Sequence, residues 1–201
     1  MRFIFLSVVT VLFLSCNDNK TEQQNTQAAT EASTVQVPSK HTAAFNRDVQ
    51  SAMSDYYKMT EAFVNWDSAQ LPAVSARLAA SLDRVQSTIQ TDSFGQEAQT
   101  HLTAAQKQTA AVAKAGNITS SRHAFNALTD AWFSFLKSVQ YDRQKLYLQL
   151  CPMAFNDTEP GIWISAQDSI RNPYLGLHHP YYKSGMLECG ENKEVLDFVG
   201  K

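Results

Sequence analysis

The chain has 201 residues, of which 44% are hydrophobic, and its formal net charge at pH 7 is -2. This length suits one ordinary domain with unstructured ends, and the hydrophobic fraction is enough to form a core. Because the charge is close to zero and no block of Lys or Arg occurs, the sequence argues against binding to nucleic acid or to an anionic membrane surface.

The N-terminus predicts export. Arg2 precedes an apolar run over residues 3–14, which is too short to span a bilayer and has the length of a signal-peptide core. The run ends in Leu14-Ser15-Cys16, which resembles the lipobox of bacterial lipoprotein signals. This resemblance implies a signal peptide over residues 1–15, lipidation of Cys16, and attachment through the lipid alone on the periplasmic side of a membrane or at the cell surface. The alternative is an ordinary secretory peptide.

Residues 16–41 are expected to form a tether between the lipid and the folded domain. The stretch from Asn17 to Lys40 is rich in Thr, Gln, Asn, Ala and Ser, and it contains no aromatic residue. Such a composition buries too little apolar surface to order the chain. The folded domain is therefore expected over residues 42–201.

Four stretches with helical spacing of apolar residues follow the tether. They run over residues 45–66, 71–89, 94–114 and 119–139. Asp67 or Ser68 is expected to cap the second helix, and Thr119 or Ser120 the fourth. Because the connections are short, the expected fold class is all-α: an up-down four-helix bundle with a C-terminal turn-rich Cys/Met segment packed on it.

The predicted helices offer no chemistry of their own. His101 and His123 stand singly, without the spacing of metal ligands, and the inward Glu-x-x-His pairs of di-iron bundles are absent from the sequence. The sequence also lacks a G-x-S-x-G nucleophile turn, an H-E-x-x-H motif and a glycine-rich phosphate loop. We therefore expect that the protein is not an enzyme.

Residues 145–190, the Cys/Met segment, hold the residues that point to a function. Leu146, Leu148 and Leu150 alternate, which predicts a short strand leading into Cys151-Pro152. The rest is rich in Pro and Gly and predicts turns. The candidate site residues of this segment are the following: Cys151, Met153, His178, His179, Met186 and Cys189.

Thiolates and thioethers are the ligands that soft cations prefer, so two Cys and two Met predict a site for copper(I) or silver(I). His178 or His179 is expected as a substitute ligand. Zinc is the less suited metal, because two thiolates and two imidazoles at these spacings match no established finger pattern.

The alternative is a disulfide between Cys151 and Cys189, which exported cysteine pairs commonly form. Its closed loop would contribute about 4 kcal/mol in the chain-entropy model.

Three stretches of the chain, LYLQLCPMAF, IRNPYLG and GMLECG, resemble the family known as Domain of Unknown Function 3347 (DUF3347). That family pairs a helical domain with a C-terminal C-P-M, N-P-Y and M-L-x-C-G signature. The resemblance implies an association with heavy-metal handling, since members are exported lipoproteins or are fused to adaptor subunits of copper/silver-type efflux pumps. His178 and His179 lie between the N-P-Y and M-L-x-C-G stretches, where this chain has more residues than the family's signature.

The resulting expectation is an exported lipoprotein that binds Cu(I) or Ag(I) in the cell envelope, with an efflux adaptor as its expected protein partner. The alternative is a docking module stapled by the disulfide. In that case the contact surface would be formed by aromatic side chains of the Cys/Met segment, namely Trp163, Tyr174, Tyr181 and Tyr182.

Overall fold

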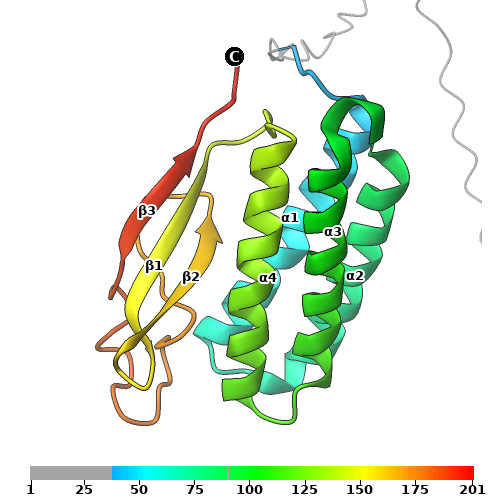
Figure 1. The fold of residues 1–201 in the computed structure, drawn as a ribbon. Coiled ribbons are helices and arrows are strands. Elements are labelled where there is room, and N and C mark those ends of the chain that lie inside the picture. The colour runs from blue at the N-terminus through cyan, green and yellow to red at the C-terminus, as the bar shows by residue number, and fades with distance from the viewer. Residues whose placement is uncertain (1–37, 90) are drawn as a thin grey trace, which may run out of the picture. The chain divides into compact units, whose positions relative to one another are not determined.

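The computed structural model describes residues 38–89 and 91–201, except for the side chains of residues 91–93 (Figure 1). The predicted signal peptide, Cys16 and nearly all of the predicted tether lie outside the described residues. The described part contains four α-helices followed by three β-strands.

The four predicted helices are all present. They are α1 (Ala43–Val64), α2 (Leu71–Thr88), α3 (Thr91–Lys114) and α4 (Ile118–Ser138), and a short 3-10 helix, η1 (Ser68–Gln70), precedes α2. The predicted cap of the fourth helix was wrong. The cap is Asn117, whose side-chain oxygen accepts a hydrogen bond from the Ser120 amide at 2.8 Å. Among the described residues, no helix combines the length and the apolar character needed to cross a membrane.

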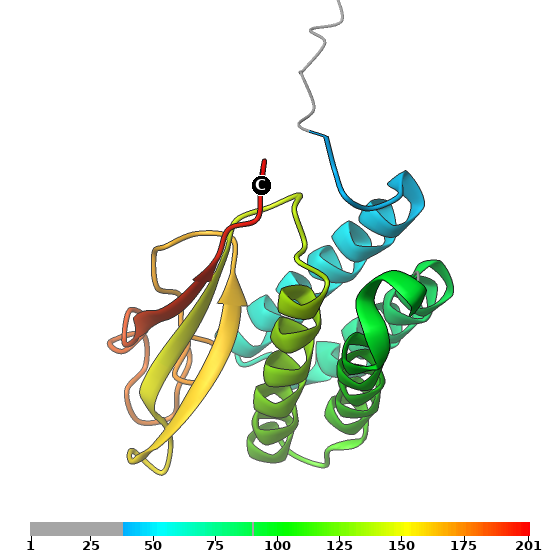
Figure 2. The ribbon, with the colours of Figure 1, turned by 45° about the horizontal axis from the view of Figure 1, so that its top comes forward.

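The prediction of an all-α fold was wrong, because the Cys/Met segment and the residues after it form a sheet. The strands are β1 (Leu146–Phe155), β2 (Glu159–Ser165) and β3 (Glu191–Leu196), and their order is β2-β1-β3 with antiparallel neighbours. Figures 1 and 2 show the sheet beside α4, with β2 as the strand nearest to that helix. The predicted short strand is therefore the start of β1.

A sheet forms here because the Cys/Met segment alternates in the way that a half-buried strand requires. Leu146 and Leu148 are buried on β1, and Ile164 is buried on the neighbouring strand β2. A turn-rich loop could not satisfy its own backbone groups while covering the helices, whereas a sheet pairs them strand to strand. The expected packing of this segment against the helices thus occurs through strands.

Aromatic side chains fill the space between α1 and α4, and the sheet is joined to them. The Phe125 ring lies 4.8 Å from Phe63 and 5.5 Å from Tyr56, centroid to centroid. The buried Tyr56 hydroxyl shares a hydrogen bond with Thr129 at 2.6 Å and accepts one from the Ile164 amide at 3.1 Å. One phenol therefore connects α1, α4 and β2 inside the core.

Arg122 ties the start of α4 to the end of α1 and to the loop after β2. Its side chain is 4% exposed and donates to the carbonyl oxygens of Phe63 and Pro173, each at 3.3 Å. The guanidinium also lies 3.8 Å from the centre of the Trp66 ring. Burial lowers the pKa of Arg122 to about 10, so the group stays charged at neutral pH.

We predict that Arg122→Ala lowers the free energy of unfolding by about 3 kcal/mol, because it removes the donor to the Pro173 carbonyl, leaves the Phe63 carbonyl with the Trp66 amide as its donor, and removes the stack on Trp66. The measurement is urea unfolding followed by circular dichroism. The control is Arg47→Ala on the exposed face of α1, which should change the same quantity by less than about 0.5 kcal/mol. Equal effects of the two substitutions would contradict this role of Arg122.

Candidate metal-binding thiol pair

The structure brings together the two cysteines of the Cys/Met segment. Cys151 lies on β1 and is fully buried, and Cys189 lies just before β3 and is partly buried. Their sulfur atoms are 3.7 Å apart, and both thiols are free. The predicted convergence of these two residues is therefore present, in the form of two thiols in van der Waals contact.

The sheet presents Cys151 to the loop that contains Cys189. Gln149, two residues before Cys151, donates from its side chain to the backbone oxygens of Gln167 and Ser169, each at 3.1 Å. Because alternate residues of a strand share a face, Cys151 points to the same, loop-covered face of β1. Strand pairing is regular as far as Cys151 and Gly161 and then shifts, as expected after Pro152, which has no amide proton.

Asn172 holds Cys189 in place. Its side chain donates to the Cys189 carbonyl at 2.7 Å, and its backbone amide donates to the Leu187 carbonyl at 2.8 Å. The side-chain oxygen accepts from the amides of Tyr174 and Leu175, at 2.7 and 3.0 Å. Asn172 is fully buried, and its bonds to the Tyr174 and Leu175 amides are made away from water. This role was not predicted from the sequence, although Asn172 is the first residue of the N-P-Y motif.

Burial keeps the Cys151 thiol protonated at neutral pH. Burial raises its pKa from 9.0 to about 11, and the neighbouring Cys189 thiol adds to the rise, whereas hydrogen bonds from the Met153 backbone and the Asn172 side chain oppose it. Since the folded value is the higher one, the protonated thiol stabilises the fold below pH 9, and this contribution is lost as the pH rises through 11.

Each methionine lies beside a cysteine along the chain. The Met153 backbone hydrogen-bonds the Cys151 sulfur, and the Met186 carbonyl accepts from the Cys189 amide at 3.1 Å. Both methionine side chains are partly buried and pack against the hydrophobic core. A thioether placed in this way can fill space in the core or bind a soft ion at the edge of the thiol pair.

The two histidines differ in their surroundings. His178 is exposed, whereas the His179 Nδ1 accepts hydrogen bonds from the amides of Tyr181 and Tyr182, both at 3.1 Å. The His179 ring also packs edge-on against Trp66 at 5.1 Å. Burial lowers its pKa, so the neutral ring that these bonds require is favoured. These contacts give His179 a structural role in the loop.

A site built from His, Cys, Asp and Glu alone is not formed in the part of the chain that the structure describes, since no three such residues cluster there. The arrangement that the fold does provide is one buried and one partly buried thiol in contact, with two thioethers nearby in the chain. Its chemistry suits soft metal ions or thiol oxidation.

Residues 52–144 match the family model described as "Protein of unknown function (DUF3347)", which confirms the predicted resemblance to that family. The match runs from the middle of α1 to the connection before β1. It does not include the thiol pair, so the C-terminal signature and its link to efflux adaptors stay predictions. Neither a curated protein nor a solved structure matches the chain.

We predict that the two thiols of the native apo protein react at different rates with iodoacetamide at pH 8. Cys189 should react quickly, and Cys151 slowly, because its raised pKa leaves about a hundredfold less thiolate than an ordinary cysteine has. The measurement is mass spectrometry of a Cys16→Ser chain over time. Adding Cys189→Ser should remove the fast phase, and adding Cys151→Ser should keep it. If Cys151 reacted with iodoacetamide equally fast in the native and in the urea-unfolded protein, this result would contradict its burial.

Proposed function

We propose that this protein binds Cu(I) or Ag(I) through Cys151 and Cys189, and that it carries or buffers the ion in the cell envelope without catalysing a reaction. The observation that carries the proposal is the pair of free thiols with sulfur atoms 3.7 Å apart. Two sulfur atoms at this distance can bind one ion between them after a small rotation of the Cys189 side chain, with its backbone held in place.

The chemistry of the donor set favours a soft monovalent ion. Two thiolates provide the soft ligands that Cu(I) and Ag(I) prefer, and Met153 and Met186 offer thioethers as further ligands. Zinc is less favoured, because structural zinc sites take four nitrogen, sulfur or oxygen ligands. Of the two histidines, His179 already accepts two backbone hydrogen bonds through Nδ1, and His178 is exposed.

Burial of Cys151 also makes the predicted metal affinity depend on pH. A thiol with a pKa of about 11 must lose its proton when it binds a metal ion, so the apparent affinity should increase with pH. In return, the buried Cys151 would shield one side of the bound ion from water, and the partly buried Cys189 would leave the other side open to a receiving protein. This behaviour fits a carrier that retains its ion until another thiol-rich protein takes it.

The proposed setting follows from the sequence. Lipidation at Cys16 after removal of residues 1–15 would hold the domain at a membrane on the exported side. An adaptor subunit of a heavy-metal efflux pump is the proposed protein partner, on the strength of the C-P-M, N-P-Y and M-L-x-C-G stretches.

A second candidate function is a docking module stapled by a Cys151–Cys189 disulfide. Two observations favour it: the same short distance between the thiols, and a Tyr181 side chain that is 81% exposed in the loop between them. The two functions exclude each other in any one molecule, because an oxidised pair offers no thiolates. The redox state of the purified protein therefore distinguishes them.

We predict that a reduced Cys16→Ser chain binds one equivalent of Cu(I) in competition with a chromophoric chelator. Cys151→Ser should weaken this binding by more than about a hundredfold, and Met153→Leu by about tenfold, since the first removes a thiolate and the second a thioether. The matched control is Met59→Leu, a volume-conserving change of a methionine buried in the helical core, which should leave the affinity unchanged.

The outcome that would refute the metal proposal is a Cys151→Ser protein that is folded and keeps its full copper affinity. Thiol titration of the protein unfolded immediately after purification completes the test. Two reactive thiols in the Cys16→Ser chain support the metal site, whereas none supports the stapled docking module.

A further inference from the structure

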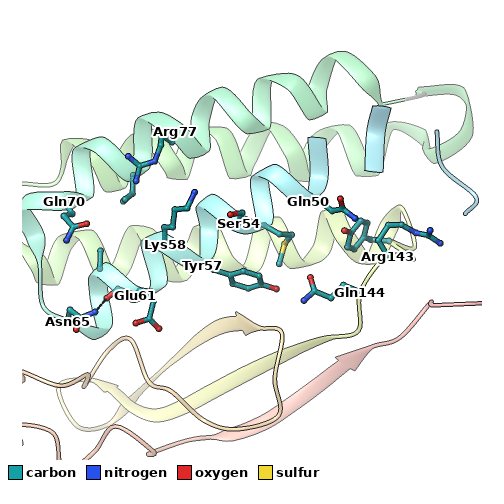
Figure 3. A pocket seen from close by; sticks show the side chains of 14 residues that line it. Gln50, Ser54, Tyr57, Lys58, Glu61, Asn65, Gln70, Arg77, Arg143 and Gln144 are labelled. Atoms are coloured by element: carbon teal, nitrogen blue, oxygen red, sulfur yellow. Dashed lines mark hydrogen bonds between the residues drawn. The ribbon is translucent and has the colours of Figure 1, made fainter. Parts of the chain in front are cut away.

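A cleft of about 960 Å³ runs along α1, and neither cysteine of the thiol pair lines it. Its walls come from α1, from η1 and the start of α2, and from the connection between α4 and β1. Figure 3 shows Tyr57 in the middle of the row from α1, with Gln50, Arg143 and Gln144 at one end and Asn65 and Gln70 at the other. This volume is within the range of small-molecule sites, roughly 300–1,000 Å³.

The cleft is lined by groups that can both donate and accept hydrogen bonds. The side-chain amides are those of Gln50, Asn65, Gln70 and Gln144, and hydroxyls come from Ser54, Tyr57 and Tyr141. An amide or a phenol can bind the hydroxyl groups of a ligand in either direction. The flat Tyr57 ring adds an apolar surface of the kind on which a sugar ring can lie.

Two of these hydroxyls are buried without a partner. Among the described residues, no group makes a hydrogen bond of good geometry with the Tyr57 or Tyr141 hydroxyl, although the side chains of Gln144 and Gln50 come near them. Tyr141 is only 1% exposed, and burial raises its pKa to about 12. A buried hydroxyl without a partner is costly, and a ligand in the cleft can supply the missing bonds.

The charged groups of the lining lie beside opposite charges. Lys58 pairs with Asp55 at 2.9 Å, and Glu61 pairs with Arg171 at 2.7 Å. Asp55 is buried, yet hydrogen bonds from Lys58 and Ser81 keep its pKa low against the opposing effect of burial, so it is ionised. Arg77 also faces Asp55, at 3.9 Å.

At the other end of the cleft, Arg143 lies 3.0 Å from the buried carboxylate of Asp142, whose pKa stays low although burial opposes this. Each charged side chain of the lining thus faces an opposite charge, with Lys58 and Arg77 sharing the one carboxylate of Asp55. The free hydrogen-bonding capacity of the cleft is on neutral groups.

We infer that this cleft binds a neutral, hydroxyl-rich ligand, namely a short oligosaccharide or a stretch of a neutral glycan. The amides of Gln50 and Gln144 and the hydroxyls of Tyr57 and Tyr141 contact the sugar hydroxyls, and the Tyr57 ring packs against a sugar face. The site is separate from Cys151 and Cys189, so it adds a ligand to the proposed metal function and does not depend on it.

The test is isothermal titration calorimetry of the Cys16→Ser chain with maltotetraose, cellotetraose and chitotetraose as neutral probes, and with tetragalacturonate as an acidic probe. At least one neutral tetrasaccharide should bind, and tetragalacturonate should bind more weakly. A second arm uses soluble glycan chains, hydroxyethyl cellulose and glycol chitin. Binding of the tetrasaccharide alone identifies a free saccharide as the ligand, and binding of a polymer identifies a glycan chain.

Gln144→Ala and Tyr57→Phe should each weaken the affinity for the bound neutral probe by about tenfold, the loss expected for a neutral hydrogen bond. The matched control is Gln96→Ala, an exposed glutamine on α3, which should bind normally. Three results would overturn the inference: no neutral probe binds, tetragalacturonate binds most tightly, or the cleft substitutions act no more strongly than Gln96→Ala. Copper affinity of Gln144→Ala should equal that of the parent chain.

Discussion

The hydrogen bonds of the buried Asn172 side chain are the constraint on which the thiol pair depends. They join the backbone before β3 to the turn that starts at Pro173, so Cys189 cannot move from Cys151 without breaking bonds away from water. An unmade hydrogen bond at a buried amide costs more than the bond contributes when made. A polar side chain in the loop thus holds the Cys189 backbone where the two sulfur atoms lie 3.7 Å apart.

The helices hold the thiol pair in position through their contacts with the sheet and the loop after β2. Tyr56 holds β2 against α1 and α4, and Arg122 holds the loop after β2 against the ends of the same helices. β1 lies between β2 and β3, so Cys151 is held on a strand that is paired on both sides. The family match covers the helices, and the proposed chemistry lies in the sheet and loop that those helices support.

How far the sequence predicts this structure depends on the range of the interactions. The helices follow from apolar spacing within 20 or so residues, and all four were predicted. The sheet was missed because β3 pairs with a strand some 40 residues earlier and, on its own, shows mostly exposed polar residues. Only a contact with β1 makes it a strand.

Within the candidate site, the sequence indicated which cysteines would meet but not the contacts of the residues around them. The convergence of Cys151 and Cys189 was expected from their type and compartment. The contacts of His179 were not, because they depend on Trp66 and on two amides of its own loop. The hydroxyls of Tyr57 and Tyr141 likewise belong to stretches that the sequence marks only as helix and helix end.

Copper K-edge X-ray absorption of the reduced protein loaded with one equivalent of Cu(I) tests the central claim most directly. The account predicts a first shell made of sulfur alone, which loses a sulfur ligand and gains nitrogen or oxygen in Cys189→Ser. A first shell dominated by nitrogen or oxygen in the parent protein would show that the thiol pair does not hold the metal ion.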